Sequence, residues 1–520
     1  MRLTKKKWEA VLQSSSFILV LLAGVIILVR LLTFNEPFER DLMVYAVTAR
    51  ELLSGRPLYA DLWDIKPPGI YWVYALSQLL VGYNRWSIFL LGVSSAIITL
   101  LGIFQVVTVL TRHRMSASWS AFFWALLSGD VLLQANQPNV EVFLNAAFVW
   151  ALFYFVRAYS LNQGQCYESR RQNLFVLPLL MLFAAGFLWA IASLLKQVAL
   201  VLPILLSVYV FFYPPADRRW QGRLLYAAVL LLPIFLVWAT VAAYFTATNR
   251  WEIFHFTMID YGRLYASQSA KFTSHLSWWM RLWPASLSST LPIVFLLLAS
   301  TCLSRHYRYP AWKVLVVCAF AIQVAIILPG NYFAHYYQLW LPWVCIAVGV
   351  SLSQCQNTVQ AQKIVVRLCL LVGTATFLGQ WVNWNLTPDQ ISIRKYSTSF
   401  FVNLPKKARE IDALLLPDET FYEYGFDAGL YFETKRRPPV GIINVGTQFV
   451  PLPRRLQDRI IADLKRTKPE MAIIDHFFPA SPVTQFLNQH YVPVPHFKQS
   501  LGLVVMARRG GNLLRRNKPR

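Results

Sequence analysis

The strongest constraint on the fold is a succession of long apolar segments along most of the chain. Eleven of them have the length and hydropathy of helices that cross a bilayer. They lie at about residues 14–33, 86–111, 117–134, 139–157, 174–192, 195–213, 223–246, 284–303, 311–329, 336–353 and 364–384. Hydrophobic residues make up 56% of the chain and charged residues only 14%, which excludes an ordinary soluble protein. The sequence therefore predicts an α-helical polytopic membrane protein with about 11 transmembrane helices.

A twelfth apolar segment, from Ile70 to Val81, decides the topology because it is too short for a full crossing. If it does not cross, the basic connections that follow it lie on the same side as the N-terminal lysines. These connections are residues 111–114, 170–171, 218–219 and 305–308. Basic loops are retained in the cytoplasm, so we expect this segment to re-enter the membrane or to lie at its interface. The net charge of +24 then reflects loops beside anionic lipid, and no nucleic-acid-binding module is visible.

The character of the sequence changes at about residue 385. With the N-terminus inside, an odd number of spans places the residues that follow on the outer face. Amphipathic helices are predicted at residues 406–416 and 456–466, and short strands at 420–425, 470–475 and 503–507. The predicted division is a transmembrane domain over 1–384, a small α/β domain over 385–507 and a disordered basic tail over 508–520.

The outer loop at residues 34–85 carries more ionisable groups than a membrane protein normally places beside a bilayer. Asp41, Asp64 and Lys66 lie within it, and a Pro-Pro-Gly turn follows the lysine. Acidic and basic groups at a membrane are costly, which makes them functional candidates. The alternative is an ordinary solvated loop. We place the predicted active site in this loop.

Further polar residues reach the same outer face in the predicted topology. They lie at residues 136–141, 196–197, 247–283 and 330–335. Transfer of a group from a lipid-phosphate donor requires a carboxylate that takes the proton of the attacking acceptor. It also requires cations or a metal ion beside the departing phosphate. The acids and bases on this face satisfy both requirements.

Several motifs then suggest a family. Residues 39–76, ERDLMVYAVTARELLSGRPLYADLWDIKPPGIYWVYAL, resemble the first outer loop of bacterial glycosyltransferase family 39-like membrane enzymes. These enzymes belong to the GT-C superfamily, which includes protein O-mannosyltransferases and lipid A aminoarabinose transferases. Shorter similarities are NQPNVE at 136–141, LKQ at 195–197 and NYFAHYY at 331–337. The resemblance extends over essentially the whole chain.

This resemblance implies a glycosyltransferase of the inner (cytoplasmic) membrane that works on the outer face. Such an enzyme transfers a sugar from a polyprenyl-phosphate-linked donor, with inversion, to a lipid, glycan or protein acceptor of the cell envelope. Asp41 matches the family's catalytic base, although Leu42 replaces the acidic residue that many relatives have next. Lys66 is the expected contact of the donor phosphate. Asp64 either supports a metal ion, orients Lys66 or has a structural role.

Several of the remaining candidates have two interpretations. Lys196 lies between two apolar runs, where it either binds donor phosphate or extends its ammonium group to the interface. His335 and Tyr336 either hold donor phosphate or a metal ion, or make structural hydrogen bonds. Glu141 is expected to cap or orient its helix. The residues assigned to the acceptor side are His255, Asp260 and Arg263.

Two other classes of protein stay open at this point. A transporter or flippase of lipid-linked sugars would place ionisable residues near the midplane of several spans, whereas here they gather at one face. A non-catalytic scaffold would explain the spans but not Asp41 and Lys66. No cofactor is implied with certainty. A divalent metal ion stays open, although the His and acidic candidates do not have the spacing of a metal-binding motif.

Overall fold

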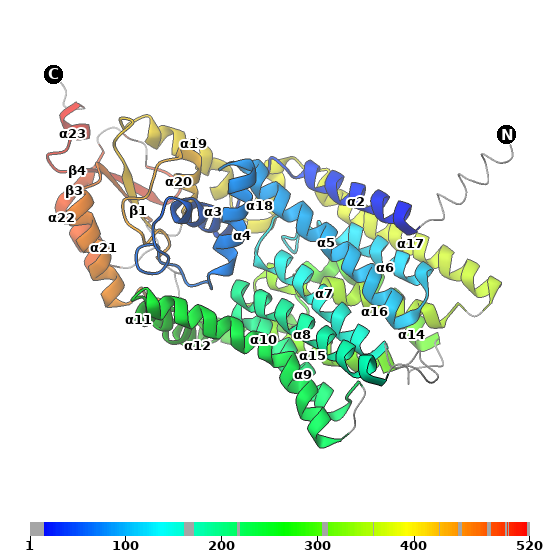
Figure 1. Ribbon diagram of the computed structural model, residues 1–520. Helices are drawn as coiled ribbons and strands as arrows, with labels where there is room; N and C mark the ends of the chain where they lie inside the picture. Colours follow the sequence, from blue (N-terminus) through cyan, green and yellow to red (C-terminus); the bar gives the residue numbers. More distant parts are fainter. Residues whose placement is uncertain are drawn as a thin grey trace. The chain divides into compact units, whose positions relative to one another are not determined.

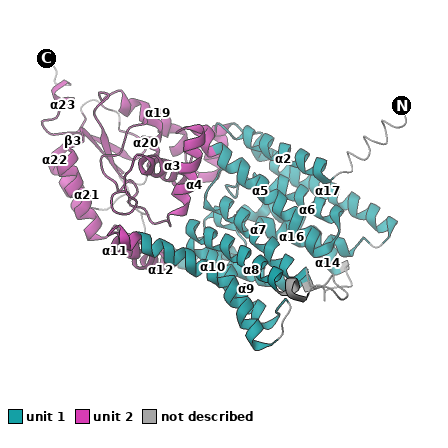
Figure 2. Cartoon of the chain, viewed as in Figure 1, with its two compact units in different colours: residues 1–35, 89–244, 273–387 teal, residues 36–88, 245–272, 388–520 magenta. Residues whose placement is uncertain are grey.

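The computed structural model describes residues 15–160, 171–215, 219–303, 310–356, 358–425, 427–445, 450–475, 480–494, 497 and 499–516. The chain forms two compact units, each assembled from three separate stretches of sequence (Figure 2). Unit 1 contains residues 1–35, 89–244 and 273–387, and unit 2 contains residues 36–88, 245–272 and 388–520. Each unit is described by itself below.

Unit 1 is helical, and Figure 1 shows its long helices packed side by side. Its main helices are α2 (Ser15–Leu32), α5 (Arg85–Thr111, from residue 89), α6 (Arg114–Leu127), α7 (Val140–Ser160), α8 (Arg171–Leu195), α9 (Val201–Phe212), α10 (Trp220–Ala247, to residue 244), α14 (Leu291–Leu303), α15 (Pro310–Ile327), α16 (Trp340–Gln354) and α17 (Val359–Trp384). Short turns of helix join them at η1 (Gln197–Leu200), η3 (Thr273–His275), α13 (Trp278–Leu282), η4 (Ala285–Thr290) and η5 (Ala334–Leu339).

A helix lies at each of the eleven predicted spans, and within the described residues seven helices are long and apolar enough to cross a membrane. The others are shorter than predicted. Helix α6 ends at Leu127 because turns follow it, and α16 begins at Trp340 after the turns of η5. The prediction of a multi-pass helical membrane protein is confirmed. Parts of the basic connections used for the topology, such as residues 305–308, lie outside the described residues.

Close helix packing in unit 1 depends on small residues. Helix α16 packs against α6, α14 and α15. A Cβ atom added to Gly349 of α16 would collide with the hydroxyl of Ser120 on α6. Lipid supplies no hydrophobic force between helices, so tight contact between backbones is an important source of their association. Gly349 therefore allows α16 to pack closely against α6.

Unit 2 combines a four-stranded sheet with helices (Figure 1). Its strands are β1 (Phe421–Tyr424), β2 (Met471–Asp475), β3 (Tyr491–Pro493) and β4 (Leu503–Arg508), in the order β1-β2-β4-β3. Strands β1 and β2 are parallel, and the other two pairings are antiparallel. Its helices are α3 (Arg40–Leu53), α4 (Gly69–Val81), α11 (Trp251–His255), η2 (Phe256–Tyr261), α12 (Gly262–Phe272), α18 (Pro388–Tyr396), α19 (Phe400–Asp412), α20 (Gly429–Thr434), α21 (Arg454–Thr467), α22 (Pro482–His490) and α23 (Asn512–Arg516).

The predicted helices and strands of the C-terminal region are confirmed as α19, α21, β1, β2 and β4. The outer loop at residues 34–85 does not fold separately from the C-terminal region. Its Trp63 is buried in the same core as Tyr261 and Tyr422 of β1. The Trp63 indole donates a hydrogen bond to the Thr257 hydroxyl at 2.9 Å. Residues 36–88 and 245–272 thus fold with the C-terminal region, which differs from the predicted division at residue 384. The placement of this unit on the outer face stays a prediction.

The prediction of a disordered tail over residues 508–520 is wrong for the part that the structure describes. Arg508 ends β4, and α23 follows it. Leu513 of α23 is buried, and the Arg516 guanidinium lies 2.7 Å from a carboxylate oxygen of Glu419. One buried leucine and one ion pair order a segment whose composition alone is typical of disorder. Residues 517–520 lie outside the described residues.

Candidate functional site

Asp41 lies in the first turn of α3, at the end of the helix that favours negative charge. Glu39 is the N-cap residue, and its carboxylate accepts a hydrogen bond from the Asp41 backbone N–H at 3.0 Å. The Tyr45 hydroxyl, one turn later, donates to Oδ2 of Asp41 at 3.3 Å. Leu42, at the position where the resemblance leads one to expect a second acid, is fully buried. Asp41 itself is half-buried.

Asp64 is buried in the turn before α4. Its carboxylate accepts hydrogen bonds from the Tyr71 hydroxyl at 2.5 Å and from the Asn444 amide at 3.2 Å. Burial raises the pKa of Asp64, the Tyr71 hydrogen bond and the Lys66 charge oppose this, and the Asp41 charge adds to it. The rings of Tyr45 and Tyr71 pack edge to face with centroids 6.2 Å apart. The two carboxylates therefore lie near each other, linked through two tyrosines.

Lys66 extends from the same turn and is half-buried. The buried Tyr59 donates its hydroxyl hydrogen to the Lys66 carbonyl oxygen at 2.8 Å, which fixes the backbone. Pro68 is the N-cap residue of α4, and this helix begins at once with Gly69. The structure thus brings Asp41, Asp64 and Lys66 into one neighbourhood of unit 2, as the sequence predicts.

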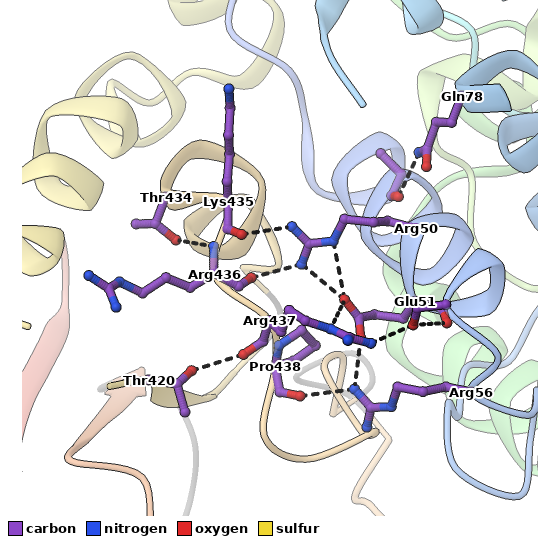
Figure 3. Close-up of polar contacts among 12 residues, drawn as sticks. Arg50, Glu51, Arg56, Gln78, Thr420, Thr434, Lys435, Arg436, Arg437 and Pro438 are labelled. Carbon is purple, nitrogen blue, oxygen red and sulfur yellow. Dashed lines mark hydrogen bonds and ion pairs between the residues drawn. The ribbon is translucent and has the colours of Figure 1, made fainter. Parts of the chain in front are cut away.

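Helix α3, which carries Asp41, is attached at both ends to the C-terminal part of unit 2. At its N-terminus, the Arg40 guanidinium donates to Asp427 at 3.0 Å. At its C-terminus, the buried carboxylate of Glu51 lies 3.2 Å from the Arg56 guanidinium and 2.8 Å from that of Arg437 (Figure 3). Arg50 donates to the carbonyl oxygens of residues 435 and 436 in the same cluster. These contacts fix the helix that presents Asp41.

Three charged residues beside Asp41 were not predicted. Glu36 and Lys395 form a fully buried ion pair with a distance of 2.6 Å between Nζ and Oε1. Burial raises the pKa of Glu39 to about 8, the Asp41 charge adds to this, and the Lys395 charge opposes it. The acids at 36, 39 and 41 are visible in the sequence as a dense run. Lys395 gives no such signal, because it is 359 positions from Glu36.

Unit 1 contains a second polar cluster around Lys196. This lysine lies in extended backbone between α8 and η1. Its ammonium group lies 2.6 Å from the carboxylate of Glu141 and 3.5 Å from the ring centroid of Tyr336. The Lys196 side chain is only 12% exposed. Glu141, predicted to cap or orient its helix, is thus the ion-pair partner of Lys196.

His335 lies beside this cluster and is buried. Its Nδ1 lies 3.1 Å from Oε1 of Gln134, and its ring meets the ring of Tyr336 edge to face at 4.8 Å. The structure therefore brings Lys196, His335 and Tyr336 together in unit 1. Whether they contact a donor phosphate stays a prediction.

The acceptor-side candidates lie on α11, η2 and α12 of unit 2. The His255 ring and the Asp260 carboxylate are 3.6 Å apart, and both are about half exposed. Arg263 is exposed on the next turn. Among the described residues, no group of three His, Cys, Asp or Glu side chains is arranged to hold a metal ion. The acceptor role of these three residues stays a prediction.

Comparison with known proteins identifies the fold of the chain. Residues 65–244 match the sequence model of the dolichyl-phosphate-mannose-protein mannosyltransferase family. The crystal structure of ArnT from Cupriavidus metallidurans bound to undecaprenyl phosphate is similar over 94% of this chain and 97% of that chain, with a TM-score of 0.58 and 17% identity. The chain has the GT-C fold. The resemblance predicted from the sequence is confirmed.

A second structure of the GT-C type is archaeal. AglB oligosaccharyltransferase from Archaeoglobus fulgidus, in complex with an inhibitory peptide and a dolichol-phosphate, is similar over 96% of this chain and 76% of that chain, with a TM-score of 0.55 and 12% identity. No curated protein sequence matches the chain. The family match begins at Ile65, so it contains Lys66 and Lys196 but not Asp41. The assignment of Asp41 depends on the motif and on its surroundings in the GT-C fold.

Proposed function

We propose that the protein is a membrane glycosyltransferase that transfers a sugar from a polyprenyl-phosphate-linked donor to an acceptor on the outer face of the cytoplasmic membrane. The GT-C fold supports the reaction class. Two proteins of similar structure are described with undecaprenyl phosphate and with dolichol-phosphate, which supports a lipid-phosphate donor.

The observation that carries the proposal is the setting of Asp41. Its carboxylate is half-buried at the start of a firmly attached helix and receives a hydrogen bond from Tyr45. Carboxylates are weak bases at neutral pH, so a fixed position relative to the acceptor is what makes one effective. A side chain on a mobile loop would not meet this requirement.

In the proposed reaction, an acceptor oxygen or nitrogen attacks the anomeric carbon of the sugar. Asp41 takes the proton of the acceptor as the new bond forms. The bond between the anomeric carbon and the phosphate oxygen breaks, and the phosphate leaves with its electron pair. Attack from the face opposite the leaving phosphate inverts the anomeric centre.

Cations are proposed to stabilise the departing phosphate, because negative charge gathers on it. Lys66 is the proposed contact of the phosphate in unit 2, in the neighbourhood of Asp41 and Asp64. The donor-phosphate role predicted for Lys196, His335 and Tyr336 is a separate proposal, which rests on their own cluster in unit 1. Glu141 holds the ammonium group of Lys196 in place through their ion pair. Asp64 is proposed as a supporting group that orients the turn of Lys66.

The experiment is transfer by the purified protein from a radiolabelled polyprenyl-phosphate sugar to an envelope extract. Asp41→Asn keeps the size of the side chain and removes its charge, so transfer is expected to fall by at least about a hundredfold. Asp458→Asn, at an exposed carboxylate of α21 in the same unit, is the matched control and keeps normal transfer. Near-normal transfer by a folded Asp41→Asn protein refutes the assignment. Movement of the donor across a vesicle membrane without transfer favours a flippase.

A further inference from the structure

Three carboxyl groups gather at the start of α3, and one lysine from a distant part of the sequence reaches them. Glu36, Glu39 and Asp41 are close neighbours in the chain. Lys395 of α18 forms its ion pair with Glu36 at 2.6 Å, and neither side chain is exposed. Its charge also acts on Glu39, whose carboxylate accepts the Asp41 backbone N–H. Helix α18 therefore supplies a buried cation to the surroundings of Asp41.

The next residue of α18 shows that this helix faces the whole group. The charges of Glu39, Glu36 and Asp41 all act on the hydroxyl of Tyr396. The other titratable or charged groups that face the cluster are Tyr45 of α3, Asp64 before α4, Tyr74 of α4, Arg40, which pairs with Asp427, and Arg85 of α5. Of the cations among these, Arg40 has a carboxylate partner outside the cluster, and Arg85 donates a hydrogen bond to the backbone carbonyl oxygen of Glu36 at 2.6 Å.

We propose that Lys395 is a positioning residue that keeps the Asp41 carboxylate ionised. The proposal rests on the proposed function, since it assumes that Asp41 is the base. A carboxyl group accepts a proton only when it is ionised, and neighbouring carboxylates disfavour ionisation. The ammonium group of Lys395 opposes them.

Infrared titration of the purified protein tests this proposal without substrate. The carboxyl signal that Asp41→Asn removes reports the ionisation of Asp41, and each variant is compared with its own Asp41→Asn partner. Lys395→Met is expected to raise the midpoint of this signal by about one pH unit, because a nearby positive charge is lost. Lys395→Arg keeps the charge and is expected to restore the midpoint. Glu36→Gln removes a negative charge and is expected to lower it.

Lys395→Met and Glu36→Gln break the same ion pair, but they are expected to shift the midpoint of the Asp41 signal in opposite directions. Opposite shifts distinguish an electrostatic role of Lys395 from structural damage. Lys407→Met is the matched control, since Lys407 is a buried lysine of α19 paired with Glu410 at 2.7 Å. It is expected to leave the midpoint unchanged. If Lys395→Met does not fold, the lowered midpoint of Glu36→Gln still decides. An unchanged midpoint in either folded variant, or shifts of the same sign, overturns the proposal. Retained transfer by Asp41→Asn would instead refute the assignment of Asp41 as the base, on which this proposal rests.

Discussion

The attachment of α3 at Glu51 leads to a prediction about stability. The Glu51 carboxylate is fully buried and lies within 3.2 Å of guanidinium groups of Arg50, Arg56 and Arg437. Removing one partner of a buried ion pair destabilises a protein by about 3–5 kcal/mol, because the remaining charges are left uncompensated. Arg437 is 61% exposed, so water screens its share and the lower half of this range applies. We expect Glu51→Ala to destabilise unit 2 by about 3–4 kcal/mol.

A destabilisation of this size is large enough to measure in detergent. For a unit of roughly 200 residues it corresponds to a fall in Tm of about 6–16 °C. Thermal unfolding of the purified protein, followed by tryptophan fluorescence, provides the assay. Asp458→Ala is the control, because its pair with Arg454 is exposed on α21 and contributes at most about 0.5 kcal/mol. A Tm for Glu51→Ala equal to that of the control would refute the reasoning.

Three further predictions concern single side chains. Lys66→Ala is expected to weaken use of the donor by about 10- to 150-fold through loss of roughly 1.5–3 kcal/mol of charge-assisted contact, measured as kcat/KM for the donor; an unchanged value would show that Lys66 is structural. Lys196→Gln is expected to lower donor use, while Glu141→Gln, which keeps the cation, is expected to lower it less; equal loss in both variants would favour a purely structural pair. Since burial raises the pKa of Glu39 from 4.5 to about 8, the folded state holds a proton that the unfolded chain releases, so stability falls as pH rises from about 4.5 to about 8. Unfolding measured across this range is expected to show a flatter dependence for Glu39→Gln, and an unchanged slope would contradict the shift.

Hydropathy predicted most of the architecture because the spacing of apolar residues reports helices directly. The positions of the eleven spans were found, and so were the main helices and three of the four strands of the C-terminal region. What the pattern does not encode is which distant segments share a core. Trp63 and Tyr261 pack with Tyr422 across gaps of roughly 160 to 360 residues, so the outer loop was not predicted to fold with the C-terminal sheet.

The site was predicted in part for the same reason. Asp41, Asp64 and Lys66 belong to one local motif in the sequence. Tyr45 and Tyr71 of the same stretch hydrogen-bond to Asp41 and to Asp64. Lys196 and Tyr336 were both predicted as site residues, but no pattern in the sequence indicates the ion pair between Lys196 and Glu141. Lys395 was missed because a single lysine in a polar helix resembles any solvated residue. Only the folded chain shows that it is buried against Glu36.

Mass spectrometry of cell-envelope glycans tests the central claim most directly. A deletion strain is complemented with the wild-type protein, with Asp41→Asn or with no protein, and expression and membrane insertion of both forms are verified. The proposed glycosyltransferase predicts that one envelope species loses the mass of a single sugar unit on deletion and regains it only with the wild-type protein. Accumulation of the sugar-loaded polyprenyl phosphate should accompany the loss. Full recovery of the glycan with Asp41→Asn would contradict the role of Asp41, and an unchanged glycan profile in the deletion strain would contradict the proposed function.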